Sequence, residues 1–230
     1  MSDGPVKARG RFLGRLIYEP LPDGRRMQLV EPFGFIDERA KAWSVPIGAK
    51  VDGASIPQAL WSFVGGPFEG KYRDASVIHD YYCDVRLEPW RAVHCMFYDA
   101  MLVSGVSESR AKVMYAAVYF GGPRWSDTAV ENAKLTHVQA RLSDGGTRFK
   151  DGILNAVEII GDSPATRSRH PGVSRTDTQQ AQLDLRMLER LIEENAPSLA
   201  EIDDAMNEVI DLTDPKDAEA KPVRVVVLTP

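Results

Sequence analysis

The first fifty residues alternate short apolar runs with turn residues, a pattern typical of β-strands. Phe12 to Tyr18 is rich in strand-forming residues, and Met27 to Val30 follows after a Pro-Leu-Pro-Asp-Gly segment. An Asp-Gly pair between two apolar runs is a strong hairpin signal. Residues 33–37 and 42–45 are two shorter strand candidates. This spacing predicts an antiparallel β-meander with one buried face.

The hydrophobic period changes in the second quarter of the chain. Apolar residues recur at three- and four-residue steps in three segments, which begin near Tyr72, Pro89 and Ser107. This period predicts three helices, the last of which ends at a Gly-Gly-Pro run. A short helix is also expected over residues 58–64, directly after Pro57. Strands followed by a group of helices indicate the α+β class.

The C-terminal part has a different pattern. Residues 179–195 place Leu and Ile at helical spacing and predict an amphipathic helix. A second helix is expected over residues 199–212, and the apolar run 223–228 predicts a terminal strand. The helical face has two interpretations: it packs on its own domain, or it pairs with a second copy or with another protein.

We therefore expect three regions. Residues 1–125 form a globular α+β domain, in which the antiparallel β-meander packs against a three-helix layer. Residues 126–178 show little periodicity and are expected to be an irregular segment and linker. Residues 179–230 form a helical C-terminal arm with a terminal strand.

Composition narrows the class of protein. The chain has 230 residues, 43% hydrophobic residues and a formal net charge of -5, which suits a domain with a real core and excludes wholesale disorder. No run approaches the about 18 apolar residues of a membrane span. The start lacks the apolar core of a secretory signal, so we expect no signal peptide and a cytoplasmic protein. Two cysteines cannot build a disulfide framework, and mild acidity gives no reason to expect nucleic acid.

The densest chemistry lies between residues 45 and 82. Val45 begins a Val-Pro-Ile-Gly stretch that leads to Asp-Gly-Ala-Ser-Ile-Pro at residues 52–57, followed by Trp61, a Gly-Gly-Pro loop from Gly65, and His79-Asp80. These pieces, in this order, resemble the phage and prophage proteins catalogued as domain of unknown function 1353. The resemblance covers residues 11–122. It implies a phage or prophage origin, near tail or lysis genes, and no established activity.

The turn at residues 52–55 has two interpretations. In one, Asp52 accepts backbone hydrogen bonds and Ser55 caps the following helix, so both residues serve the fold. In the other, the turn presents Asp52 and Ser55 to a cleft. A serine nucleophile needs a neighbouring base, and the Gly-x-Ser-x-Gly elbow is absent here.

His79 and Asp80 are adjacent within one predicted helix, so their side chains point about 100° apart and do not pair. One interpretation is a structural hydrogen-bond network that joins helix and loop. The other is catalytic: His79 acts as general base, Asp52 orients it, Asp80 holds an ion or the helix, and Ser55 contacts substrate. In that case the cleft would be lined by Trp61, Tyr82, Gly65 and Gly66.

Two further interpretations concern metals. The His-Asp helix is locally similar to that of secreted phospholipase A2, which would give His79 the role of activating water and Asp80 that of holding calcium. The chain departs from that signature, because Ser76 and Cys83 do not match its cysteine positions. His79 and Cys83 are also four residues apart and can supply two zinc ligands from one helix face, with His94 and Cys95 on the next helix. Because His94 and Cys95 diverge on their helix, ordinary core positions are favoured, and we predict no metal and no cofactor.

Two functions follow from these interpretations. The first is a structural or assembly component of a virion-like particle, which forms homo-oligomers or binds other virion proteins through residues 179–230. The second is a small hydrolase that acts on an ester, amide or phosphodiester of the cell envelope, with His79 as base. A catalytic histidine should be partly exposed, whereas a structural one should be buried with its ring nitrogens occupied.

Overall fold

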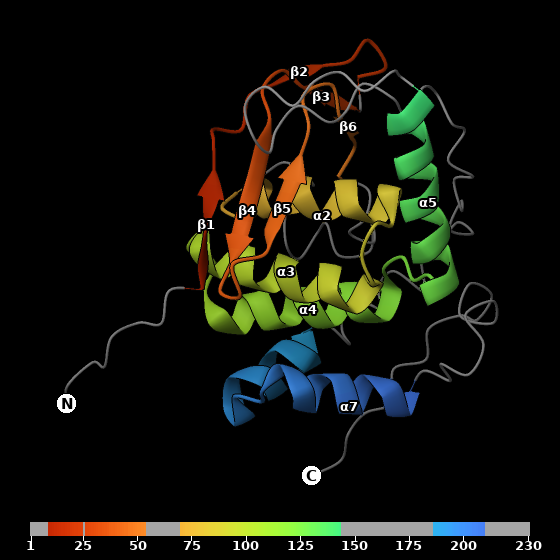
Figure 1. The fold of residues 1–230 in the computed structure, drawn as a ribbon. Helices are drawn as coiled ribbons and strands as arrows, with labels where there is room; N and C mark the ends of the chain where they lie inside the picture. The colour runs from red at the N-terminus through yellow and green to blue at the C-terminus, as the bar shows by residue number, and fades with distance from the viewer. Residues whose placement is uncertain (1–8, 25, 54–69, 144–185, 210–230) are drawn as a thin grey trace.

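Two small antiparallel sheets form the first half of the fold. The computed structural model describes residues 9–24, 26–53, 70–143 and 186–209. Three strands form one sheet in the order β1 (Gly10–Leu13), β4 (Phe33–Asp37) and β5 (Ala42–Val45). Three more form the other sheet in the order β2 (Tyr18–Pro20), β3 (Met27–Leu29) and β6 (Lys50–Val51). Figure 1 shows the first sheet standing against the helices and the second at one end of it.

The strand connections go beyond the expected meander. The Asp-Gly hairpin joins β2 to β3 as predicted, and β4 pairs with β5. However, β1 pairs with β4, and β3 pairs with β6, so the run from Phe12 to Tyr18 contributes to two sheets. Gly14 lies between its two halves with a φ of 76°, a left-handed conformation that interrupts an extended strand. The α+β class itself is confirmed.

The three predicted helices are present and form layers. They are α2 (Arg73–Val85), α3 (Trp90–Val103) and α4 (Glu108–Gly121). Helix α2 contacts β5, β6 and α3, and α3 contacts β1 and β4 as well as α4. Both α2 and α3 therefore pack against the strands, and α4 packs on α3 (Figure 1). As a result, residues 75–83 of α2 are all buried. A helix buried all round must also bury whatever polar residues it carries, and α2 carries His79 and Asp80.

Helix α5 (Asp127–Ser143) lies within the segment that was expected to be irregular. The Oγ atom of Ser126 accepts the backbone N–H of Ala129 at 3.3 Å, which is the geometry of a helix start. Trp125 and Val130 are buried there. The local signal was the Ser-Asp pair at the helix start, because the apolar stripe of this helix is weak. Residues 144–178 lie outside the described residues.

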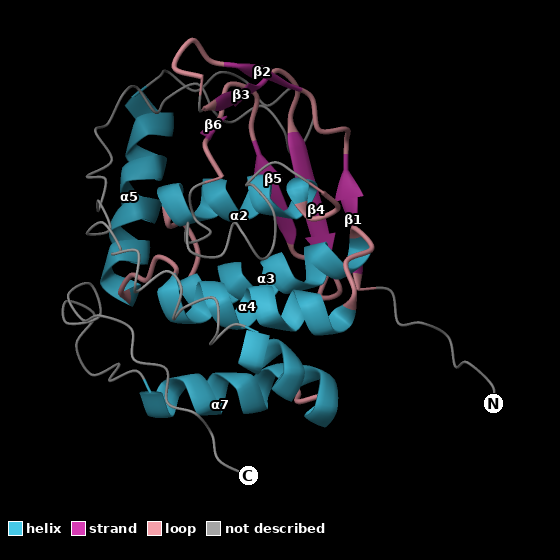
Figure 2. Ribbon diagram, turned by 180° about the vertical axis from the view of Figure 1, so that it is seen from behind, coloured by secondary structure: helices cyan, strands magenta, loops and turns pink. Residues whose placement is uncertain are grey.

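The C-terminal helices pack on the domain itself. Helical residues 186–195 precede α7 (Leu199–Val209), and α7 contacts α4 (Figure 2). Ile192 and Ile202 are buried. The structure therefore favours packing on the same chain for this stretch. The short helix expected at 58–64 and the strand expected at 223–228 lie outside the described residues. Within the described residues, no helix has the length and apolarity that crossing a membrane requires.

Candidate functional site

His79 faces a second histidine across the interface between α2 and α3. Its Nε2 atom lies 2.9 Å from Nδ1 of His94, and both side chains are at most 1% exposed. The pair is enclosed by aromatic rings: Phe97 lies 4.6 Å from the His79 ring and Trp90 lies 5.4 Å from the His94 ring, measured between centroids. His79 is thus a core residue whose polar partner comes from the next helix.

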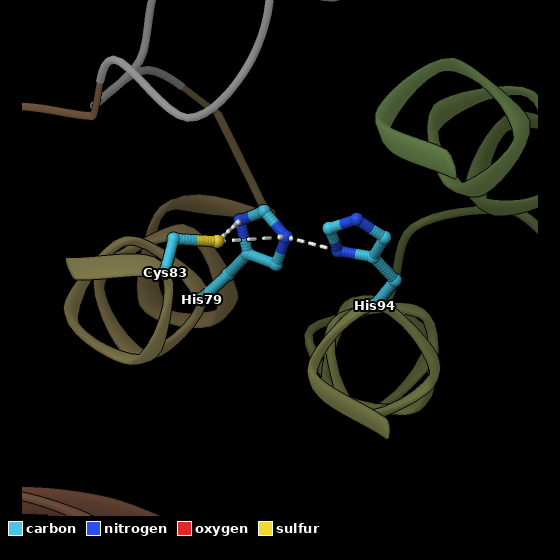
Figure 3. A group of neighbouring side chains, drawn as sticks. All are labelled: His79, Cys83 and His94. Atoms are coloured by element: carbon cyan, nitrogen blue, oxygen red, sulfur yellow. Dashed lines mark hydrogen bonds between the residues drawn. The ribbon is translucent and has the colours of Figure 1, made fainter. Parts of the chain in front are cut away.

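Cys83 completes a cluster of three possible metal ligands. It lies one helical turn beyond His79, and its Sγ atom is 3.7 Å from Nε2 and 3.8 Å from Nδ1 of that ring. Figure 3 shows the thiol and the two imidazoles side by side between α2 and α3. One donor atom from each of His79, Cys83 and His94 lies within 4.8 Å of the others, and all three residues are buried. We call these three residues the His-Cys-His cluster.

Burial keeps both imidazoles of the cluster uncharged. Loss of hydration lowers the pKa of His79 from 6.5 to about 3. Burial also lowers the pKa of His94 well below its usual value, and the nearby His79 and Arg124 lower it further. A neutral imidazole has one N–H donor and one lone pair that accepts a hydrogen bond or binds a metal. The cluster therefore offers lone pairs at neutral pH.

The side chain of Asp80 points in a different direction from that of His79 and holds the turn after β6. Its Oδ2 atom accepts the backbone N–H of Asp52 at 2.8 Å and that of Gly53 at 2.9 Å. Gly53 has a φ of 64°, a left-handed conformation that favours glycine. From the sequence, Asp52 was expected to orient His79. In the structure the ring of His79 contacts His94 instead, and the backbone N–H of Asp52 is bound by Asp80.

Tyr82, which was expected to line a cleft, ties α2 to the first sheet. Its hydroxyl oxygen accepts the backbone N–H of Ser44 at 3.1 Å, and its ring packs edge-on against Trp43 at 4.9 Å. Burial raises the pKa of its phenol. The other expected site residues, Ser55, Trp61, Gly65 and Gly66, lie outside the described residues, so their roles stay predictions.

The partner that the catalytic hypothesis missed is His94. The sequence placed it beside Cys95 on one helix without deciding which of the two faces α2. In the structure His94 faces His79, whereas the Sγ atom of Cys95 lies 3.7 Å from the hydroxyl of Tyr115 on α4. The spacing of His79 and Cys83 was the available signal, because residues four apart share a helix face.

Comparison with known proteins gives a family for the central part of the chain. Residues 27–118 match the model of a family described as protein of unknown function (DUF1353). The match confirms the resemblance inferred from the motifs, and it contains β3 to β6, α2, α3 and most of α4, including the whole His-Cys-His cluster.

Two curated relatives come from Sinorhizobium fredii (strain NBRC 101917 / NGR234). The uncharacterized protein y4jT is 48% identical over 170 residues, which cover 74% of this chain and 47% of the relative. The uncharacterized protein y4iH is 42% identical over 120 residues, which cover 52% of this chain and 50% of the relative. The chain therefore spans about half the length of the curated relatives it matches. No solved structure matches the chain.

Proposed function

We propose that this protein is a structural component of a phage-like particle and that its His-Asp helix serves the fold. The observation that carries the non-catalytic role is the burial of His79, whose ring faces His94 and Cys83 at 1% exposure. Its neighbour Asp80 holds the turn at Asp52 and Gly53. The particle itself rests on the family resemblance, which implies a phage or prophage origin.

The hydrolase alternative receives less support from the same geometry. A general base works best when its pKa lies near the operating pH and when it reaches the proton that it removes. Burial lowers the pKa of His79 to about 3, and its ring is enclosed by core side chains. Calcium at Asp80, by analogy with phospholipase A2, is disfavoured because one oxygen of that carboxylate already accepts two backbone N–H groups.

We narrow the segment proposed for assembly to the last part of the C-terminal region. The apolar faces of residues 186–209 are largely used inside the chain, where Ile202 is buried and Tyr115 bonds to Asp203. We therefore assign contacts with a second copy, or with other particle proteins, to residues 210–230. This segment includes the apolar run 223–228, which has the sequence of a strand that could extend a sheet edge of a partner.

Two measurements test the proposal. The first is hydrolysis of ester, amide, phosphodiester and cell-wall substrates by the full chain, for which we expect no turnover above that of buffer. Turnover that His79→Gln abolishes in a folded variant would overturn the structural role. The second is co-sedimentation of the tagged chain with phage-like particles from an induced culture of its source bacterium. Absence from purified particles would reject the particle assignment.

Light scattering tests the assembly segment separately. The full chain is compared with a chain that ends at Val209 and so keeps α7. We expect an oligomer for the full chain and a folded monomer for the shortened one, because the shortened chain retains the buried contacts of Ile192 and Ile202. Equal masses for the two chains would place assembly elsewhere or exclude it.

A further inference from the structure

We propose that His79, Cys83 and His94 bind one zinc ion between α2 and α3. The three residues come from two helices that are consecutive in the chain, and one donor atom of each lies within 4.8 Å of the others (Figure 3). Two imidazole nitrogens and one sulfur form a donor set that zinc accepts in proteins. The inference concerns a ligand and stands independently of the particle role proposed above.

Two of the three donor separations in the cluster are close to those of a tetrahedral zinc site, and the third, between Sγ of Cys83 and the His94 nitrogen, is within 4.8 Å. Zinc–nitrogen bonds of about 2.0–2.1 Å and a zinc–sulfur bond of about 2.3 Å place the donor atoms roughly 3.3–3.6 Å apart. The observed separations are 2.9 Å between Nε2 of His79 and Nδ1 of His94, and 3.7 Å between Sγ of Cys83 and that Nε2. Insertion of the ion needs the two rings to separate by about 0.4 Å. It also needs the thiol of Cys83, which lies on the side of the His79 ring away from His94 (Figure 3), to rotate toward the two facing nitrogens.

One ring nitrogen of the cluster has no hydrogen-bond partner among the described residues. The contact between His79 and His94 uses one proton, and whichever ring supplies it, Nε2 of His94 remains without a partner in the described residues. The contact between Cys83 and His79 is a weak thiol interaction at 3.7–3.8 Å. Zinc at Nδ1 of His94 would leave Nε2 protonated as before, so the two facing nitrogens and the neighbouring thiol, and not Nε2, favour the ion.

The protons balance for a zinc complex. His79 binds through Nε2 and keeps its proton on Nδ1, His94 binds through Nδ1 and keeps its proton on Nε2, and Cys83 binds as a thiolate. One thiol proton is therefore released to solvent for each ion bound, and the affinity falls as the pH falls.

The donor atoms of the cluster favour zinc over calcium, the other metal that the sequence suggested. Calcium takes six to eight oxygen ligands, whereas this cluster supplies nitrogen and sulfur. Within the described residues the cluster has three protein ligands. A zinc ion held by three protein ligands completes its tetrahedron with a water molecule, and here that water would lie in a space enclosed by core side chains. The ion would then fasten α2 to α3.

Metal stoichiometry tests the proposal directly. The full chain is purified without a histidine tag, stripped with a chelator, incubated with ZnCl₂, separated from free metal and analysed by elemental mass spectrometry. We expect one zinc per chain and a rise in Tm. Substitution with Co²⁺ should add a thiolate-to-metal charge-transfer band in the near ultraviolet. Absence of bound zinc in the folded wild-type chain would overturn the proposal.

The two free cysteines supply a matched pair of variants. Cys83→Ser removes the sulfur ligand with little change in volume, and Cys95→Ser changes the cysteine of α3 that contacts Tyr115 instead. We expect Cys83→Ser to lose the cobalt band and to bind zinc more than about tenfold more weakly, whereas Cys95→Ser should match the wild type. Circular dichroism of the metal-free variants checks that both are folded. Equal zinc binding by the two variants would place the ion elsewhere and reject this site.

A failure here differs from a failure of the proposed function. If no zinc binds, the buried His79–His94 pair remains a structural element of a non-catalytic protein. If zinc binds and hydrolysis depends on it, the zinc site stands and the structural role is the proposal that falls.

Discussion

The carboxylate of Asp80 accepts the backbone N–H of Asp52 at 2.8 Å, across 28 positions of sequence. The same oxygen accepts the N–H of Gly53. One carboxylate on the buried helix α2 thus fixes the turn that follows β6. Hydrogen bonds to a charged acceptor are stronger than neutral ones, so this contact orders the turn of the Asp-Gly-Ala-Ser motif at its first two residues.

Replacing Asp80 tests this role. Asp80→Ala leaves two backbone N–H groups without their acceptor, and we expect it to lower the free energy of unfolding by about 2–4 kcal/mol. The exposed Glu131 on α5 supplies the control: Glu131→Gln should change stability by less than about 0.5 kcal/mol. Urea denaturation followed by circular dichroism measures both. Similar losses for the two variants would contradict the role given to Asp80.

The buried histidine pair should behave as a coupled unit in the metal-free protein. His79→Leu removes the partner of His94 Nδ1 and leaves both nitrogens of that ring unsatisfied, which should cost about 1–3 kcal/mol. The double variant with His94→Leu removes both polar groups and should come close to wild-type stability or exceed it. Chemical denaturation in the presence of EDTA gives the double-mutant cycle. Additive losses would show that the two rings do not interact.

Asp99 on α3 should make stability depend on pH. Burial is the main reason that its pKa is raised from 3.8 to about 6. The nearby Glu38 and Asp37 also raise this pKa, whereas Arg9 and Arg39 lower it. A carboxyl whose pKa is raised in the folded state binds more protons there than in the unfolded state. Its contribution to the free energy of unfolding is therefore complete below about pH 3.8 and is lost as the pH rises through about 6. Ionised Asp99 therefore destabilises the fold at neutral pH.

The matching variant is Asp99→Asn. We expect it to be more stable than the wild type at about pH 8, by about 1 kcal/mol after solvent screening is considered, and to differ little at about pH 4. Urea denaturation at the two pH values checks this, with Asp204→Asn on the exposed side of α7 as the control. A gain that is the same at both pH values would point to packing instead of ionisation.

Tyr115 should hold the C-terminal helix on the domain. Its hydroxyl donates to Asp203 of α7 at 2.6 Å, and Tyr119 donates to Asn207 at 2.8 Å. Tyr115→Phe removes the first bond and leaves a partly buried carboxylate with one donor fewer, so α7 should open more readily by about 1–3 kcal/mol. Hydrogen exchange of residues 199–209 measures that opening. Unchanged protection there, with α2 as the internal reference, would mean that Ile202 and the bond from Tyr119 to Asn207 are sufficient to hold the helix.

Local pattern was sufficient for several elements. The three- and four-residue steps of apolar residues predicted α2, α3 and α4, and the Asp-Gly pair predicted the hairpin of β2 and β3. These features depend on residues within a few positions of one another. Helix α5 was missed, because its apolar stripe is weak and its start signal is short.

For the candidate site, the sequence identified His79, Asp80 and the face that His79 shares with Cys83, because a four-residue step on a helix fixes which side chains are neighbours. It also identified the family of residues 27–118 through its motifs. Those inferences need only the regular geometry of one helix and the order of short motifs along the chain.

Only the tertiary structure decided the partners. The rotation of α3 about its axis sets His94, and not Cys95, opposite His79, and that rotation results from how α3 packs between α2 and α4. Packing likewise paired β1 with β4 and placed α7 on α4. The physical reason is shared: a local pattern determines which residues lie on one face of an element, whereas burial of all the faces together determines which face meets which.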